Sequence, residues 1–224
     1  MDRKLIDWPN DVIELADYLR IEKFHVLRMS GGGPYVAASA FKIPERILSA
    51  GIIGGMGPYK ETKKMLKNPN RTLFSLLKMF PYMSKLFIVP MWNRFRKLEF
   101  NEKTSKLIAK QGKQLPEPDK MIYNDPIFQK FFVFYIKDIL QQGSKGPFLD
   151  GKLLVKPWNF KLEEIPTDLK FYTWYGELDI NVAVEVGKFF ALKIPNCEAF
   201  YYPKEAHLSL IPNKLNEILS KLVE

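Results

Sequence analysis

The stretch HVLRMSGGGPYVAASA, from His25 to Ala40, constrains the fold of this chain more than any other feature. A mostly apolar run leads directly into a serine and three glycines, and the small residues that follow suit a helix packed closely on a sheet. A second apolar run, RILSAGIIGG, comes after a short connection. Strand, helix and strand with short connections form a βαβ unit, which requires a parallel sheet. The sequence therefore predicts an α/β fold.

The same alternation of strands and helices returns in the last part of the sequence. Leu169 to Tyr175 is a strand candidate, and the turn after it carries Glu177 and Asp179. The helix candidate VAVEVGKFFALKI follows. The next strand candidate, EAFYYP, leads into a loop that holds His207 and then into a closing helix. These elements extend the predicted parallel sheet.

The residues between these two regions follow a different pattern. They are apolar and basic, prolines interrupt them, and DPIFQKFFVFYIKDILQQG is a long helix candidate. No strand pattern is convincing there. We therefore expect a core formed by residues 1–57 and 148–224, with a helical insertion at residues 58–147.

Composition and charge narrow the classes of function. A chain of 224 residues with 46% hydrophobic residues is long enough for one sizeable core. The net charge of +9 lies in one segment, because Lys60 to Lys97 holds ten basic residues and a single acid, Glu61. No recognition motif accompanies these cations, so we expect no nucleic-acid binding.

Cysteine, histidine and apolar content give further expectations. The one cysteine, Cys197, cannot form an internal disulfide, which suits a reducing compartment. No signal-peptide pattern opens the sequence, and no apolar run approaches the ~20 residues that span a bilayer, so we expect a cytoplasmic protein. Two histidines and one cysteine cannot supply a tetrahedral metal site unaided, and no phosphate-binding P-loop motif occurs. We expect no metal and no cofactor.

Ser30 is a candidate nucleophile. A serine on a sharp turn between a strand and a helix projects its hydroxyl above the carboxyl edge of the sheet, where helix N–H groups stabilise negative charge. Glycines beside it prevent collisions with the helix. The alternative, a glycine-rich turn with an incidental serine, stays open at this point.

A serine nucleophile needs a base, and the sequence holds only two histidines. His25 precedes Ser30 on the same strand, and a rise of ~3.3 Å per residue places it roughly 16 Å away, beyond hydrogen-bond reach. His207 follows the last strand, and the loop that carries it lies at the same edge of the sheet as Ser30. Glu177 and Asp179 are both placed to orient its imidazole, although acids in turns are more often merely solvated.

The order Ser30, Asp179, His207, each after a strand, resembles that of α/β-hydrolases. The resemblance rests on DWPNDVIELADYLRIEKFHVLRMSGGGPYVAASAFKIPERILSAGIIGGMGP, which begins with the helix before the Ser30 strand, and on FYTWYGELDINVAV with KIPNCEAFYYPKEAHLSL. It implies an α/β-hydrolase-like core with a helical cap at residues 58–147. It also implies Ser30 as nucleophile, Asp179 as acid, His207 as base and the Gly31 N–H as oxyanion donor. Such a protein is a cofactor-free serine hydrolase that acts on a small-molecule ester or related acyl substrate.

Two features depart from the family's pattern. Arg28 occupies the first glycine position of G-x-S-x-G, so its side chain must find space or the turn must relax. The family's first strands, with the loop that supplies a second oxyanion donor, are not found in these 224 residues. We therefore expect an N-terminally truncated, mostly parallel sheet whose Phe24–Met29 strand is an edge, covered by a second copy or by another chain. The alternative function is a non-catalytic or incomplete α/β-hydrolase-like protein that acts as a binding module.

The basic part of the cap has two interpretations. Lysines and arginines among Phe, Leu and Met most often form a solvated face over an apolar one. A cationic amphipathic cap can also rest on an anionic membrane surface. The sequence leaves both open.

Overall fold

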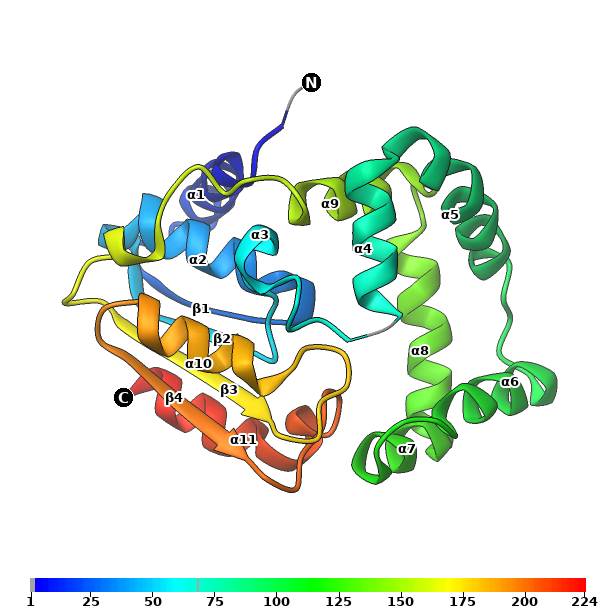
Figure 1. Ribbon diagram of the computed structural model, residues 1–224. Coiled ribbons are helices and arrows are strands. Elements are labelled where there is room, and N and C mark those ends of the chain that lie inside the picture. The colour runs from blue at the N-terminus through cyan, green and yellow to red at the C-terminus, as the bar shows by residue number, and fades with distance from the viewer. Residues whose placement is uncertain (1–2, 68) are drawn as a thin grey trace.

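The computed structural model of this chain describes residues 3–67 and 69–224, which contain one four-stranded sheet (Figure 1). All neighbouring strands pair in parallel, in the order β1-β2-β3-β4. The strands are β1 (Phe24–Met29), β2 (Ile47–Ile53), β3 (Lys170–Gly176) and β4 (Cys197–Tyr202). The predicted α/β fold with a parallel sheet is confirmed.

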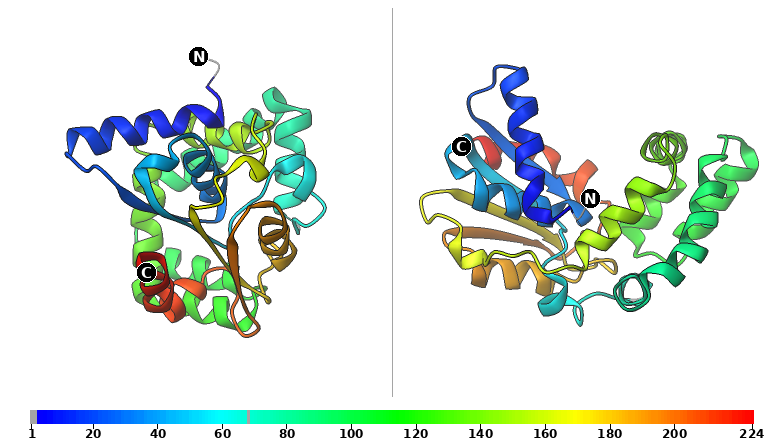
Figure 2. Two further views of the ribbon diagram at one scale, coloured as in Figure 1. Left: turned by 90° about the vertical axis from the view of Figure 1, so that its left-hand side faces the viewer. Right: turned by 90° about the horizontal axis from the view of Figure 1, so that it is seen from above.

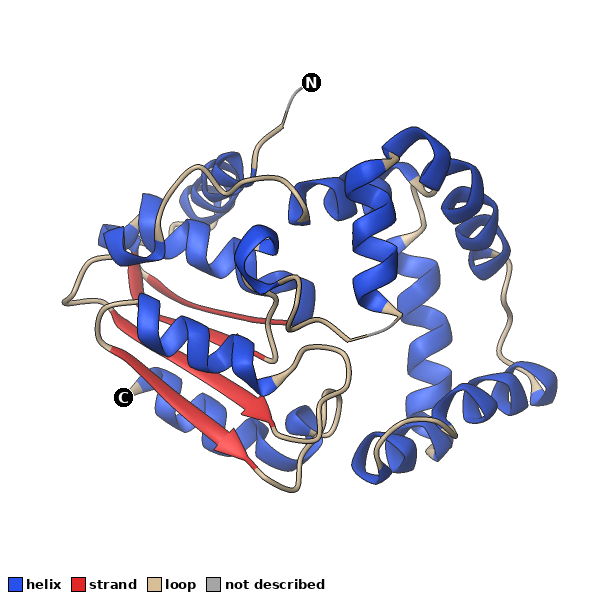
Figure 3. Ribbon diagram, in the orientation of Figure 1, coloured by secondary structure: helices blue, strands red, loops and turns tan. Residues whose placement is uncertain are grey.

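Helices cover both faces of this sheet, as Figure 3 shows with helices in blue and strands in red. On one face lie α1 (Trp8–Tyr18), α2 (Gly33–Lys42) and α10 (Val184–Lys193), and on the other lies α11 (Leu210–Val223). Three alanines of α2 are completely buried, because small side chains let this helix approach the sheet closely. Short 3-10 turns are Leu5–Asp7, Ser30–Gly32, Pro44–Arg46 and Leu162–Glu164.

The core has one apolar cluster on each face of the sheet. Along β3, Phe171 and Tyr175 join the cluster under α2 and α10, whereas Tyr172 and Trp174 join the cluster under α11. This alternation follows from the two-residue period of a strand. Because both faces are covered, β3 is buried almost throughout, as the nearly continuous apolar run in its sequence indicates.

The segment between β2 and β3 is helical, as expected, and we use the word cap for its helices; the division into core and cap domains stays a prediction. Its helices are α3 (Tyr59–Thr62), α4 (Asn70–Met79), α5 (Pro81–Arg96), α6 (Glu102–Gly112), α7 (Glu117–Asn124), α8 (Pro126–Ile139) and α9 (Lys145–Leu154). Within the described part of the cap, the only strand-like pairing is an isolated bridge between Leu66 and Val182. The cap lies beyond the edge at which the strands end, and the two views of Figure 2 agree on this placement.

Helix α9 connects the cap to the core. The expected boundary between residues 147 and 148 falls inside this helix. Near its start, Phe148 packs with Leu77 and Ile88 in an apolar cluster of the cap. At its end, Leu154 joins the main core cluster. The two parts therefore share one continuous helix.

β1 forms one edge of the described sheet, because it pairs only with β2. His25, on this strand, has a structural partner: its Nδ1 donates to Ser49 Oγ at 2.8 Å, and Ser49 in turn donates to the Leu222 carbonyl at 2.5 Å. His25 therefore ties β1 to β2 and, through Ser49, to α11, which gives it a structural role. The expectation that another chain covers the β1 edge stays a prediction.

Candidate active site

The candidate site lies where the four parallel strands end, at their common carboxyl edge. Ser30 follows β1 directly, a glycine turn follows β2, and loops with Asp179 and His207 follow β3 and β4. The Met56 N–H donates to the Ser30 carbonyl at 2.9 Å. A Cβ on Gly54 would lie 3.3 Å from His207 Nδ1 and 3.4 Å from Asp179 Oδ2. The glycine turn after β2 is thus in contact with both the Ser30 turn and the other two candidates.

Asp179 and His207 form a buried hydrogen-bonded pair. His207 Nδ1 lies 2.6 Å from Asp179 Oδ2, and the two residues are 6% and 1% exposed. The other oxygen, Oδ1, accepts from the Asn181 N–H at 2.6 Å and the Val182 N–H at 2.9 Å. An ionised carboxylate only accepts, so Nδ1 is the donor in this contact, and a neutral imidazole held in this way has Nε2 as its acceptor. This tautomer is the one a general base requires.

The same geometry decides between the two acids that the sequence leaves open. Glu177 is exposed, and its backbone N–H donates to the Tyr202 carbonyl at 3.0 Å. Asp179, two residues further on, is the acid that contacts His207. Of the two candidates, only Asp179 is placed to orient the imidazole.

Ser30 adopts a backbone conformation that is unusual for its residue type. Its φ is +56°, in the left-handed region, which costs a non-glycine residue about 1–2 kcal/mol. Strain of this kind clusters at functional sites. Ser30 Oγ makes no hydrogen bond within residues 3–67 and 69–224. The structure brings Ser30 to the same edge as His207 without joining the two side chains.

Gly31 lies in the 3-10 turn between Ser30 and α2, at the start of a helix whose first N–H groups have no partner within the helix. A Cβ on Gly31 would be 3.5 Å from Leu154 Cδ1, so the end of the cap helix α9 covers this turn. The Gly31 N–H thus belongs to an electropositive helix start beside Ser30.

No protein-family model and no curated protein matches the sequence. Solved structures do: an alpha/beta hydrolase fold protein from Nakamurella multipartita matches with a TM-score of 0.63 and 16% identity, over 98% of this chain and 75% of that one. This chain has the α/β-hydrolase fold. A thermophilic esterase from Thermogutta terrifontis (TM-score 0.61, 15% identity, 99% and 74% covered) is also similar. So is an enol-lactonase from Burkholderia xenovorans (TM-score 0.59, 15% identity, 98% and 72% covered).

Arg28 fits into the strand-to-helix turn of this α/β-hydrolase fold because residue 32 is a glycine. A Cβ on Gly32 would lie 2.6 Å from Arg28 Cβ and 3.0 Å from Arg28 Nε. The arginine therefore occupies the volume that a side chain at position 32 would need. Its guanidinium ends over the rings of Trp8 and Tyr35, at 5.1 and 5.2 Å from their centroids. The side chain finds space without relaxation of the turn.

Tyr35 extends this contact to the cap. Its hydroxyl donates to Asp150 Oδ1 of α9 at 2.9 Å. Burial and the neighbouring Asp150 carboxylate raise the pKa of Tyr35 well above its ordinary value, so the hydroxyl stays protonated and remains a donor. Arg28, α2 and α9 are thus linked on one side of the Ser30 turn.

The structure also reveals a residue that sequence reasoning missed. Asp119, on the cap helix α7, is 1% exposed. Its Oδ2 accepts from the His207 N–H at 3.1 Å, and its Oδ1 accepts from the N–H groups of Leu208 and Ser209 at 2.8 and 3.0 Å. These N–H groups lie directly before α11, which begins at Leu210, and the start of a helix favours negative charge. A carboxylate of the cap therefore holds the loop that carries His207.

Burial raises the pKa of Asp119, while the hydrogen bonds from Ser209 and Leu208 and the nearby His207 oppose this increase. In the sequence, Asp119 and Glu117 look like ordinary acids in the first turn of a helix. Nothing local shows that one of them reaches a loop almost ninety residues away. Only the tertiary structure could identify it.

The structure also contains a cavity of about 640 Å³ elsewhere, lined by α3, the segment 155–164 and α10. Ser30, Asp179 and His207 do not line it. Among the described residues, no group of three or more His, Cys, Asp or Glu side chains is arranged to hold a metal ion.

The pairing of Arg28 with Gly32 predicts strong coupling between these two positions. Gly32→Ala should lower the free energy of unfolding by about 1–3 kcal/mol, because the new Cβ would collide with Arg28 Cβ. In an Arg28→Gly background the same change should cost much less. Urea unfolding of the four proteins measures the coupling. If the effects of Gly32→Ala and Arg28→Gly on the free energy of unfolding added up to within about 0.5 kcal/mol, the contact between Arg28 and position 32 would be contradicted.

The contacts of Asp119 predict that this cap residue stabilises the fold. Asp119→Ala leaves two buried N–H groups and one part-buried N–H group without an acceptor and should lower the free energy of unfolding by about 2–4 kcal/mol. Asp119→Asn keeps one oxygen for Leu208 and Ser209 and should cost roughly half as much.

Asp125, which accepts from the Ile127 N–H at the exposed start of α8, is the matched control. Asp125→Ala should lower the free energy of unfolding by about 1 kcal/mol. If thermal or urea unfolding gave the same loss for Asp119→Ala and Asp125→Ala, the role given to Asp119 would be refuted.

Proposed function

We propose that this chain is a serine hydrolase that cleaves an ester or a related acyl bond. The observation that carries the proposal is the buried Asp179–His207 pair, which faces the glycine turn that contacts the Ser30 turn. The strained φ of Ser30 supports its role as nucleophile. The names of two structural neighbours, an esterase and an enol-lactonase, favour an ester-type bond over other acyl bonds.

The first half of the proposed reaction transfers the acyl group to the enzyme. Nε2 of His207 accepts the Ser30 hydroxyl proton while Oγ attacks the ester carbonyl carbon. Asp179 stabilises the resulting imidazolium through Nδ1. The negative charge on the carbonyl oxygen is stabilised by the Gly31 N–H at the start of α2. The carbon–oxygen bond to the leaving group then breaks, and the alcohol departs with the proton from His207.

The second half restores the free enzyme. Water gives a proton to Nε2 of His207 and attacks the acyl–Ser30 ester, and collapse of the intermediate returns the proton to Ser30 Oγ. The free carboxylic acid is released. The missing hydrogen bond between Ser30 and His207 is compatible with this scheme, since such contacts often tighten only when substrate binds.

The first test is labelling of the folded protein with a fluorophosphonate, a probe that reacts with activated serines. Mass spectrometry should place the modification on Ser30, and both Ser30→Ala and His207→Ala should abolish it. Ser105→Ala removes a cap serine that bonds to Gln129 and should leave labelling unchanged. A folded wild-type protein that is not labelled would favour the alternative, a non-catalytic binding module of the same fold.

The role of Asp179 predicts the effect of a subtle change. Asp179→Asn keeps an oxygen that can accept from Asn181 and Val182, so the turn should survive, but its amide group favours the wrong tautomer of His207. Hydrolysis of an activated ester should fall by roughly 10³–10⁴. Glu177→Gln, which changes the exposed acid of the same turn, should leave the rate within about twofold of wild type. Equal rates for Asp179→Asn and wild type would remove Asp179 from the mechanism.

A further inference from the structure

The outer side of α5 carries an apolar surface with no partner among the described residues. Met83, Leu86 and Phe87 are 58%, 72% and 75% exposed, and Pro90 is exposed as well. Their spacing of three, one and three residues places all four on one face of the helix. We call these four residues the α5 outer face. Met79 and Phe80, at the end of α4, are 67% and 47% exposed as well.

The opposite side of α5 attaches the helix to the protein. Ser84 and Ile88 are buried, and Ile88 packs with Leu77 of α4 and Phe148 of α9, beside Trp92. One side of α5 thus accounts for its packing, and the α5 outer face is not needed to hold the cap together. Large side chains exposed at half or more of their area on one helix face are a feature of interaction surfaces.

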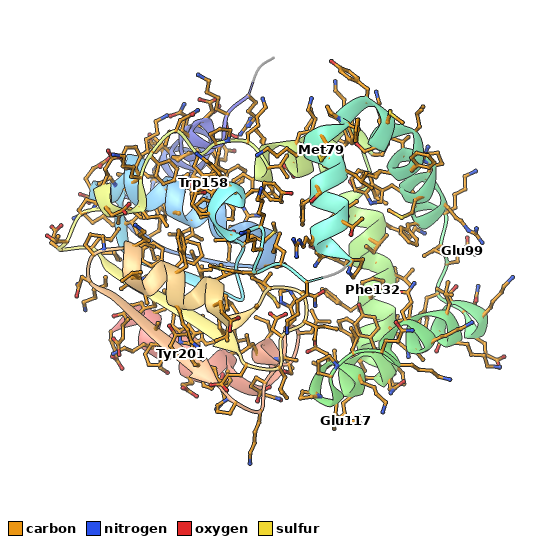
Figure 4. All side chains as sticks on the ribbon, in the orientation of Figure 1. Met79, Glu99, Glu117, Phe132, Trp158 and Tyr201 are labelled. Carbon is orange, nitrogen blue, oxygen red and sulfur yellow. The ribbon has the colours of Figure 1, made fainter. Side chains whose placement is uncertain are left out.

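The position of α5 leaves this face open. In Figure 1 the helix lies on the outer side of the cap, remote from the sheet, and Figure 2 shows the same placement from above. Figure 4 labels Met79 at the upper end of α4. The candidate active site lies on the other side of the cap, where α7 meets the His207 loop. The α5 outer face is therefore a surface separate from that site.

The charge around this face has one sign. From Thr62 to Leu98 the sequence contains nine lysines and arginines and no aspartate or glutamate. Arg94 and Lys97 follow Pro90 at intervals of four and three residues, so they lie on the same side of the chain as the α5 outer face, and both are exposed. Lys85 is also exposed, five residues before Pro90 and on another side of the helix. Within residues 62–98 every charged side chain around this apolar face is therefore a cation, and the first acid beyond Lys97 is Glu99.

We propose that the α5 outer face docks on an anionic lipid bilayer. Burial of Met83, Leu86 and Phe87 at the boundary between headgroups and acyl chains would remove their apolar area from water, while Arg94 and Lys97 would contact the negative headgroups. A second copy of this chain would bring two segments of the same strong positive charge together. Nucleic acid would use the cations but leave the apolar side chains in water. The bilayer is the partner that satisfies both features.

This association is peripheral. In the part of the chain that the structure describes, no helix is both long enough and apolar enough to traverse a bilayer. The proposed contact uses one face of a helix whose other face remains packed on α4 and α9. It is also independent of the proposed reaction, since none of its residues belongs to the candidate active site.

Co-sedimentation of the full chain with vesicles tests the proposal, and Ser30→Ala can replace the wild type so that hydrolysis plays no part. Vesicles of phosphatidylcholine with phosphatidylserine should bind the protein, and phosphatidylcholine alone should bind it at least tenfold more weakly. Raised salt should weaken but not abolish the binding, because the apolar contact is not screened. Failure to bind the anionic vesicles would overturn the proposal.

Four double variants, two on the cap and two on the core, assign the surface. Leu86→Ser with Phe87→Ser should weaken binding at least tenfold, whereas Tyr18→Ser with Leu192→Ser, which remove side chains 84% and 81% exposed on the core, should not. Arg94→Gln with Lys97→Gln should weaken binding by about fivefold for each cation, and Lys188→Gln with Lys204→Gln, on the core, should have little effect. Equal effects of cap and core pairs would overturn the assignment. The assignment would also be overturned if the α5 variants lost self-association or nucleic-acid binding while their binding to vesicles stayed unchanged.

Discussion

The parallel direction of all four strands is the constraint on which the candidate site depends. Because the strands share one direction, their carboxyl ends meet at one edge, and the residues that follow them come together whatever their separation in the sequence. Close approach of these loops requires glycine at particular points. A Cβ on Gly176, the last residue of β3, would lie 2.4 Å from the Glu205 carbonyl oxygen. The loop that carries His207 can therefore cross the end of β3 only because this residue has no side chain.

Two buried carboxylates act on that loop from opposite parts of the protein. Asp179, from the core, orients the imidazole of His207, and Asp119, from the cap, accepts from the backbone of the same residue. Burial of a charge is unfavourable unless hydrogen bonds compensate for it, and each of these carboxylates accepts three. For Asp119 the compensation is incomplete. Its raised pKa means that the folded chain binds a proton there more readily than the unfolded chain, so the contribution of Asp119 to the free energy of unfolding falls as pH rises through the shifted pKa.

The sequence predicted the parts of this structure that depend on local patterns. The strand, serine–glycine turn and helix around Ser30 follow from apolar periodicity and from glycine, and so does the placement of His207 after the last strand. Three features depend on contacts between distant residues and could not be predicted. These are the choice of Asp179 over Glu177, the space that Gly32 leaves for Arg28, and the contact of Asp119 with the His207 loop. Each depends on where a side chain points in three dimensions, and one sequence does not contain that information.

The cap is connected to the acid loop as well as to the base loop. Asn70 Nδ2, at the start of α4, donates to Asn181 Oδ1 at 3.4 Å, and Leu66 pairs with Val182 in an antiparallel bridge. On the base side, Asp119 accepts from the three N–H groups directly before α11. A shift of α7 by more than the tolerance of a hydrogen bond would leave these groups unpaired, at a cost of about 1–3 kcal/mol for each group. The cap and the two loops therefore move as one unit or separate only at a large cost in free energy.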